Sequence, residues 1–250
     1  MKEIKAKTSN RNYNILIKRN ITDDFNDILN NFFSFAKKVF FLTNEKIFML
    51  HGEKFIKKMK NNFHLEYFLL RDGEEYKNLD TLSEIYDFFL KNNAHRDDLV
   101  IAFGGGVIGD TVGMAAATFN RGITLVHYPT TIISQVDSSI GGKVAVNFQC
   151  VKNIIGCFYQ PHLVLTDPAL LQTLEEKEII NGLAEIVKYG LVFDYQIIKD
   201  LKKIISMDFK NEERLKKLIA NEKFDDIIAK CSKMKAEIVE KDEFDKGIRN

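Results

Sequence analysis

The sequence lacks tryptophan and contains only three prolines and three cysteines in 250 residues. The cysteines (Cys150, Cys157 and Cys231) are odd in number and widely spaced, which excludes a disulfide framework and a Cys-x-x-Cys metal knuckle. No apolar run approaches the roughly 18 residues that a membrane span requires. The charged N-terminus is not followed by the apolar stretch of a secretory signal. We therefore expect a cytoplasmic globular protein.

An excess of one charge sign is also missing, since 36 Lys and Arg face 35 Asp and Glu. A general nucleic-acid binder needs a clustered basic excess, so neither nucleic acid nor a membrane surface is an expected partner. Within residues 101–170, where nine of the 14 glycines gather, only six side chains carry a charge. Ionised groups in an apolar region cost several kcal/mol each unless they are paired, which makes these six the first candidates for chemistry. They are Asp110, Arg121, Asp137, Lys143, Lys152 and Asp167.

Short apolar runs alternate with helical patterns up to Pro168, and only helical patterns rich in both charge signs follow. This order predicts an α/β domain with a Rossmann-like parallel sheet over residues 1–168 and an all-helical domain over 169–250. Asp167, directly before Pro168, is expected at a solvent-facing strand end. The predicted strands are 13–18, 38–43, 65–70, 99–103, 123–128 and 163–166, and the predicted helices are 51–61, 79–92 and 111–119.

The run Leu99–Phe103 leads directly into Gly-Gly-Gly-Val-Ile-Gly-Asp at 104–110, which satisfies G-x-G-x-x-G between a strand and a helix. Glycines there let backbone N–H groups and the helix N-terminus approach a pyrophosphate. The acidic ribose partner expected about 20 residues later is missing, which disfavours a standard Rossmann dehydrogenase. The strand end at Asn44 and Glu45 is one candidate for that role. The alternative is a tight turn that binds no ligand.

From Gly104 onward the sequence resembles 3-dehydroquinate synthase, a shikimate-pathway family among the sugar-phosphate cyclases. The weaker N-terminal match includes LTNE at 42–45 and DGEEYKNL at 72–79. The stronger motifs are GGGVIGD at 104–110, RG at 121–122, PTT at 129–131, QVDSSIGGK at 135–143, KNIIGCFYQP at 152–161, LQTL at 171–174, GLAEIVKYG at 182–190, KAEIV at 235–239 and DEFDKGIR at 242–249.

The resemblance implies an NAD-binding α/β domain followed by a helical domain, with the active site between them, and a homodimer. It implies conversion of 3-deoxy-D-arabino-heptulosonate 7-phosphate to 3-dehydroquinate and phosphate through transient oxidation by NAD. The implied NAD contacts are Asn44, Glu74, Lys77, Gly104, Gly105, Gly106, Val107, Gly109, Asp110, Thr130, Thr131, Lys143, Lys152 and Thr173. The implied substrate residues are Asp137, Lys143, Lys152, Asn153, Lys188, Lys235 and Arg249, with Arg121 at the phosphate.

The residue chemistry agrees with a substrate that carries both a carboxylate and a phosphate, because the implied set is rich in lysine and arginine. Glu185, the implied zinc or cobalt ligand, stands three residues before Lys188 on one predicted helix. The alternative for this pair is a solvated surface ion pair. Gly182 on the same helix costs about 1 kcal/mol relative to alanine, which indicates that something packs closely there.

The chain departs from the family at its end, because the family's two zinc histidines would lie beyond Asn250. A catalytic zinc site needs about three protein ligands, so we expect zinc to bind weakly or not at all. His51, His64 and His95 are expected on the surface, His127 in a structural or cofactor-adjacent position, and His162 in a structural one. The chain therefore resembles a truncated form, with an incomplete helical domain.

Three functions remain open from the sequence: the synthase itself, a sister cyclase or polyol dehydrogenase, and a non-catalytic NAD-binding remnant. Smaller departures cluster at 144–151, where Val144 replaces a usual threonine and Val151 removes a flexible position beside Lys152. Phe148 and Gln149 lie in the same segment. Cys150 and Cys157 flank it and are expected to be core-packing thiols.

Overall fold

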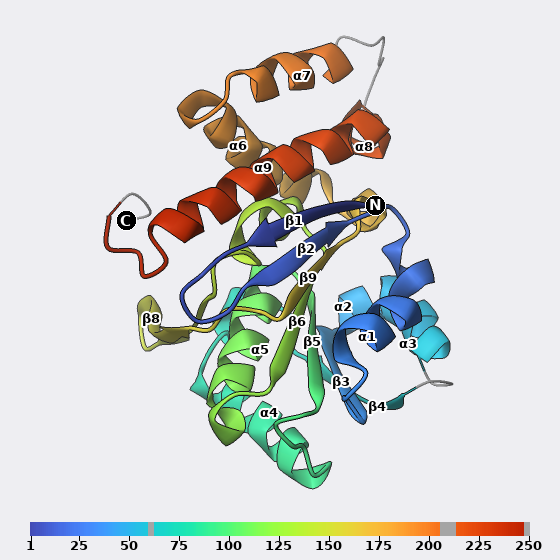
Figure 1. Ribbon diagram of the computed structural model, residues 1–250, viewed down its shortest axis with the longest axis vertical. Coiled ribbons are helices and arrows are strands. Elements are labelled where there is room, and N and C mark those ends of the chain that lie inside the picture. Colours follow the sequence, from blue (N-terminus) through green and yellow to red (C-terminus); the bar gives the residue numbers. More distant parts are fainter. Residues whose placement is uncertain (60–62, 206–213, 248–250) are drawn as a thin grey trace.

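The computed structural model in Figure 1 describes residues 1–59, 63–205 and 214–247. Seven strands form one sheet in the order β1-β2-β9-β6-β5-β3-β4, in which only the β1–β2 pair is antiparallel. Strands β3, β5, β6 and β9 are almost wholly buried apolar runs, as expected for a parallel sheet covered on both faces. Their bounds are β1 Lys2–Ala6, β2 Tyr13–Ile17, β3 Lys38–Asn44, β4 His64–Leu70, β5 Leu99–Gly104, β6 Thr124–Pro129 and β9 Leu163–Thr166.

Helices cover both faces of this sheet. On one face, α1 (Phe25–Phe33) and α3 (Glu53–Met59) pack against an aromatic core that includes Phe41, Phe103 and Tyr128. On the other face, α4 (Leu79–Lys91) and α5 (Gly106–Thr118) enclose a second core. The one-turn helix α2 (Glu45–Ile47) begins at the end of β3, where Asn44 caps it. The Rossmann-like α/β architecture predicted from the sequence is confirmed.

The last third of the described chain is helical, as predicted, and crosses the end of the sheet (Figure 1). It consists of α6 (Glu176–Val192), α7 (Gln196–Ile205), α8 (Arg214–Ala220) and α9 (Glu222–Lys241). These helices share one core with β1, β2 and the segment 132–140. The two predicted domains, 1–168 and 169–250, therefore share this apolar core. The boundary between them stays a prediction.

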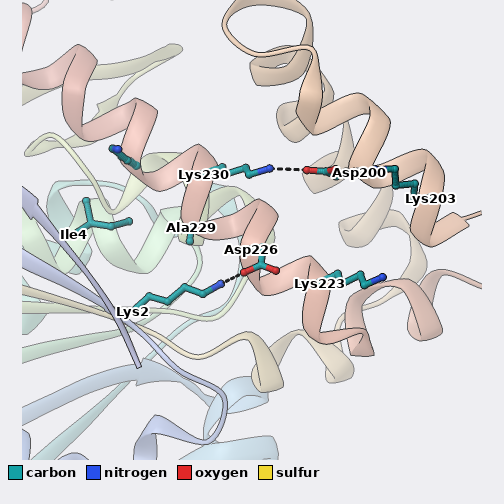
Figure 2. A pocket seen from close by; sticks show the side chains of 9 residues that line it. Lys2, Ile4, Asp200, Lys203, Lys223, Asp226, Ala229 and Lys230 are labelled. Carbon is teal, nitrogen blue, oxygen red and sulfur yellow. Dashed lines mark hydrogen bonds and ion pairs between the residues drawn. The ribbon is translucent and has the colours of Figure 1, made fainter.

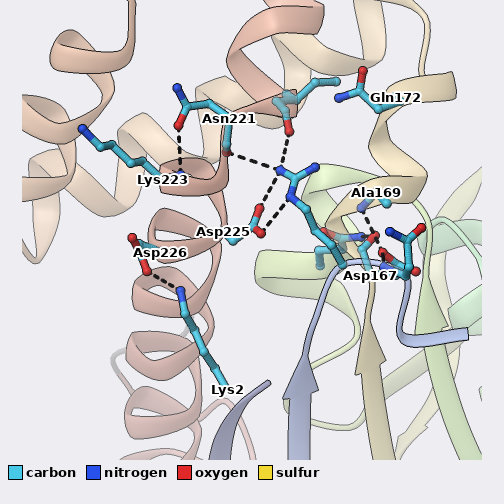
Figure 3. A network of polar contacts seen from close by, with 12 residues as sticks. Lys2, Asp167, Ala169, Gln172, Asn221, Lys223, Asp225 and Asp226 are labelled. Atoms are coloured by element: carbon cyan, nitrogen blue, oxygen red, sulfur yellow. Dashed lines mark hydrogen bonds and ion pairs between the residues drawn. The ribbon is translucent and has the colours of Figure 1, made fainter. Parts of the chain in front are cut away.

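Close packing at Gly182 is confirmed, because a Cβ there would lie 2.3 Å from Cβ of Ile132. The solvent-facing position expected for Asp167 is wrong. Asp167 is buried and accepts hydrogen bonds from the backbone N–H groups of Asn20 (2.8 Å) and Ala169 (2.9 Å) (Figure 3). Its carboxylate caps the turn Pro168–Thr173, and these backbone donors repay part of the cost of its burial.

A second, two-stranded sheet was not predicted. The antiparallel hairpin of β7 (Lys143–Phe148) and β8 (Val151–Phe158) projects from the side of the molecule, with an irregular register between Val146 and Phe148. Cys150 and Cys157 lie on this hairpin and are exposed, so the expectation of core-packing thiols is wrong for both. Strand β1 and helix α1 were also missed. In the part of the chain that the structure describes, no helix combines the length and hydropathy needed to cross a bilayer.

Candidate functional site

A crevice opens at the carboxyl ends of β3 and β5. These two neighbouring strands are separated in the chain by β4, which lies on the far side of β3, so the strand order reverses here. Open parallel sheets bind ligands at such a reversal. A cavity of about 240 Å³ lies there, bounded by the chain after β3, the glycine loop and the turn Pro168–Thr173.

The glycine loop forms one wall of this nucleotide crevice. Helix α5 begins at Gly106, and its N-cap residue Gly105 offers no side chain to cap the first backbone N–H groups. A Cβ on Gly105 would lie 3.1 Å from Thr131 Cγ2, and one on Gly106 would lie 3.4 Å from Ser138 Oγ. Larger residues would therefore crowd the place where uncapped N–H groups can meet an anion.

An acidic side chain lies beside the crevice, but it does not stand about 20 residues after the glycine loop, where the motif predicts it. Asp72 follows the end of β4 and accepts a hydrogen bond from Asn44 Nδ2 at 2.7 Å. In the usual arrangement the acid follows the strand next to the one that carries the glycine loop. Here the glycine loop follows β5, whereas Asp72 follows β4, which lies two strands away in the sheet and earlier in the chain, so the acid precedes the loop in sequence. Reading the strand order first could have found it.

The opposite wall carries the predicted residue Thr173, together with one histidine that was expected elsewhere. His51 lies in the helical turn Phe48–Gly52, lines the crevice, and is hydrogen-bonded through Nε2 to Thr173 Oγ1 at 2.9 Å. Burial and then the charge of Lys54 lower the pKa of His51. His51 is thus partly exposed at the mouth of a crevice rather than on the open surface, whereas His64 and His95 are exposed as expected.

A second cavity, of about 520 Å³, lies beyond the first turn of α5, between the hairpin and α9. At its base Asp137 accepts a hydrogen bond from Tyr189 Oη at 3.0 Å and pairs with Lys235 Nζ at 2.5 Å. Burial acts to raise the pKa of Asp137, but Lys235, Tyr189 and Lys188 outweigh it, so the pKa is lowered. This carboxylate is therefore ionised at neutral pH and is surrounded by donors.

A buried lysine connects this charged pocket to α5 and the hairpin. Lys77, only 4% exposed, donates to Asp110 Oδ2 on α5 and to Asn153 Oδ1 on β8. Burial raises the pKa of Asp110, against the opposing charge of Lys77. On the outer side, Lys152 Nζ lies 4.0 Å from Glu74 Oε1 and is 75% exposed.

Two further predicted lysines lie at the rim. Lys143 Nζ pairs with Asp245 at 2.6 Å, and Lys188 pairs with Glu185 while contributing to the low pKa of Asp137. Both lysines are about half exposed, while Glu185 is mostly covered. The Glu185–Lys188 pair is thus a partly buried contact beside the pocket rather than a fully solvated pair.

The two cavities adjoin. Ser138 follows Asp137 and lies against Gly106 of the glycine loop, and Asp110 one turn later faces the charged pocket. Two predicted residues are not brought here. Arg121 follows the far end of α5 and is exposed, and Arg249 lies outside the described residues.

The described residues do not form a complete metal site. Among residues 1–59, 63–205 and 214–247, no three His, Cys, Asp or Glu side chains gather as metal ligands would. His127 is buried under α5, and burial lowers its pKa to about 4. His162 is partly buried; desolvation first, and the neighbouring Arg11 second, lower its pKa to about 3. Its Nδ1 accepts the N–H of Leu125, so its role is structural, as expected.

Another hollow, of about 600 Å³, lies between β1 and helices α7 and α9 (Figure 2). Lysines dominate its lining, and two of them are held by aspartates, Lys2 by Asp226 and Lys230 by Asp200. None of the sequence motifs contributes to it. It is therefore not part of the candidate site.

Comparisons with known proteins agree with this geometry. Residues 67–181 match the family described as 3-dehydroquinate synthase N-terminal, and residues 182–250 match 3-dehydroquinate synthase C-terminal. The 3-dehydroquinate synthase of Clostridium botulinum is 40% identical over 250 residues, covering all of this chain and 68% of the relative. That of Alkaliphilus oremlandii is 38% identical, with 66% of the relative covered. The chain thus spans about two thirds of the length of the curated relatives that it matches.

Solved structures share the fold. A 2-epi-5-epi-valiolone synthase from Streptomyces hygroscopicus, with NAD⁺ and Zn²⁺ bound, aligns with a TM-score of 0.85 at 24% identity, covering 98% of this chain and 66% of that one. A 2-deoxy-scyllo-inosose synthase, complexed with carbaglucose-6-phosphate, NAD⁺ and Co²⁺, aligns with a TM-score of 0.82 at 21% identity, covering 99% and 66%. At these identities the likeness concerns the fold alone.

Proposed function

The chain belongs to the 3-dehydroquinate synthase family, and we propose that it performs the cyclisation for which the family is named. In this reaction 3-deoxy-D-arabino-heptulosonate 7-phosphate gives 3-dehydroquinate and phosphate. The observation that carries the proposal is the closeness of Gly106, which lines the crevice, and Ser138, which lines the pocket of Asp137: a Cβ on Gly106 would lie 3.4 Å from Ser138 Oγ. A nucleotide and a sugar phosphate could therefore meet at this boundary.

On the nucleotide side, the uncapped N-terminus of α5 would hold the pyrophosphate of NAD between Gly105 and Thr131. Asp72 would accept hydrogen bonds from ribose hydroxyls while Asn44 fixes its orientation. Thr130 and Thr173, which line the same crevice, would provide further hydroxyl groups. When bound, NAD would supply a reversible hydride acceptor, so that the reaction ends without net redox change.

On the substrate side, Lys235 and Tyr189 hold Asp137 ionised, so that its carboxylate can accept a hydrogen bond from a sugar hydroxyl. Lys143 and Lys188, half exposed at the rim, would bind the anionic groups of the sugar. Asn153 and Lys152 would contribute from the hairpin. Binding in one orientation is itself a large part of catalysis in a reaction of several steps.

Relatives of this fold bind Zn²⁺ or Co²⁺, and Glu185 is the residue that the resemblance assigns to the metal. In the described residues Glu185 is paired with Lys188 and belongs to no group of three His, Cys, Asp or Glu side chains that could hold a metal. These residues do not fit a catalytic metal by themselves, and we assign no step to one. The homodimer likewise stays a prediction, which sedimentation of the purified protein would test.

The proposal is tested by adding the heptulosonate phosphate and NAD to the purified protein. Phosphate should be released in proportion to the product while no NADH accumulates. Accumulation of NADH without phosphate would instead identify a polyol dehydrogenase. Binding of NAD with no turnover would identify a non-catalytic nucleotide-binding protein.

A further inference from the structure

Asn147, which is not among the predicted site residues, lies at the register irregularity of the β7–β8 hairpin. Its side chain is partly buried and faces the turn after β4 that carries Glu74 and Lys77. It belongs to neither cavity wall. Its side chain and backbone instead link the Glu74–Lys77 turn to Asn153.

The Asn147 side chain uses both ends of its amide. Nδ2 donates to Glu74 Oε1 at 2.9 Å and to the Glu74 carbonyl at 3.4 Å, while Oδ1 accepts the backbone N–H of Asn153 at 2.8 Å. The Asn147 backbone N–H donates to the Lys77 carbonyl at 2.8 Å. A carboxylate can only accept and an N–H can only donate, so the amide orientation is fixed by chemistry.

Together these hydrogen bonds form a closed circuit of three residues, Asn147, Asn153 and Lys77. From Asn147 it runs through Asn153 to Lys77 Nζ, and from the Lys77 carbonyl back to Asn147. Asn153 has a left-handed backbone (φ 54°), which a residue other than glycine adopts rarely. The bond from its N–H to Asn147 helps hold that conformation, in which the Asn153 side chain meets Lys77.

We propose that Asn147 is a positioning residue that locks the Glu74–Lys77 turn to Asn153, so that nucleotide binding and substrate placement depend on one another. This inference rests on the proposed function, together with the NAD contacts that the resemblance implies for Glu74 and Lys77 and the substrate contact that it implies for Asn153. Only a side chain of this length, with one donor and one acceptor, satisfies both neighbours.

The first test measures the NAD dissociation constant by calorimetry for the unaltered protein and for Asn147→Asp. The change keeps the shape and the acceptor for Asn153, but it replaces the donor with a carboxylate facing Glu74. We expect about tenfold weaker binding at pH 8. Binding should recover towards pH 5, because the protonated new carboxyl can donate to Glu74 again. Val151→Ala on the same hairpin is the control and should bind as the unaltered protein does.

The second test repeats the change in a Glu74→Gln background. There the amide and the carboxylate have exchanged roles, so Asn147→Asp should weaken NAD binding less than about twofold. The thermal midpoint should follow the same reciprocal pattern, which keeps the test valid if one single variant folds poorly. An equal loss in both backgrounds, or a loss that does not depend on pH, overturns the inference. Failure of the unaltered protein to bind NAD would overturn the proposed function instead.

Both KM and kcat should change when the Asn147 side chain is removed. Asn147→Ala should raise KM for the sugar phosphate and lower kcat, and combining it with Asn153→Ala should add little, because both changes break the same circuit. Fully additive losses would show that the two residues act independently.

Discussion

The nucleotide crevice and the charged pocket adjoin, but they are built by opposite means. The crevice is shaped by backbone, at Gly105 and Gly106, and by the end of a helix. The pocket is shaped by charges that already have partners within the chain, Asp137 with Lys235 and Asp110 with Lys77. The first region therefore has little room for a side chain at Gly105, whose Cβ would lie 3.1 Å from Thr131 Cγ2. In the second, carboxylates hold the cations in place until an anionic ligand provides an alternative partner.

The largest expected effect comes from adding atoms to the crevice. Gly105→Val would place a branched side chain against Thr131, since even a Cβ would lie only 3.1 Å from Thr131 Cγ2, and should weaken NAD binding about 100-fold or more. Calorimetry measures this effect. Gly247→Val is the matched control, because this exposed glycine lies outside both cavities and its Cβ would meet Asp242 Oδ2 at an ordinary 3.7 Å; equal losses in both variants would contradict the comparison.

The next effect should be confined to the charged pocket. Asp137→Asn keeps the shape but removes the charge that Lys235 and Tyr189 stabilise. We expect kcat/KM for phosphate release to fall about 100-fold while the NAD dissociation constant changes less than twofold. Asp245→Asn, at the rim, should cost less than about fivefold. Loss of NAD binding in Asp137→Asn would show that the two regions are not separable.

A smaller effect is expected on the pH dependence of stability, through His127 beneath α5. The folded chain holds His127 neutral, with a pKa lowered by burial from 6.5 to about 4. Its contribution to stability is complete above pH 6.5 and is lost as the pH falls towards 4, because the unfolded chain takes up the proton first. Between pH 6.5 and 5 the loss should be about 2 kcal/mol. Urea unfolding should show a shallower pH dependence for His127→Gln; identical slopes would refute this account.

The smallest effect is expected in the alkylation rates of the two thiols on the β7–β8 hairpin, Cys150 and Cys157. Both thiols are exposed, but Cys157 also lines the charged pocket, where partial burial raises the pKa of its thiol, whereas Cys150 lies outside both cavities. The sugar phosphate should slow the alkylation of Cys157 about fivefold and leave Cys150 unaffected, while NAD alone should protect neither. Mass spectrometry of the labelled peptides gives both rates. Protection of Cys157 by NAD alone would place the nucleotide in the wrong cavity.

The sequence was informative where the signal is local. The glycine loop, the buried runs of β5 and β6 and the close packing at Gly182 each follow from a few adjacent residues. Asp72 was missed because the glycine loop follows the next strand, β5, so the acid comes before the loop in the chain rather than about 20 residues after it. The bond between Asn147 and Glu74 spans 73 positions, and no periodicity records such a contact. The hairpin was missed because β8 is mostly exposed and carries no alternation of buried and exposed residues.

The sheet order has a consequence for synthesis on the ribosome. Strand β2 forms early in the chain, yet its parallel partner β9 follows about 150 residues later. Until then one side of β2 has no strand beside it, and its apolar residues, Ile15 and Ile17, await a core that also includes α9. Contacts so distant in sequence form slowly. The nascent polypeptide should therefore be a client for chaperones that shield unpaired strands, until almost the whole of the described chain has emerged.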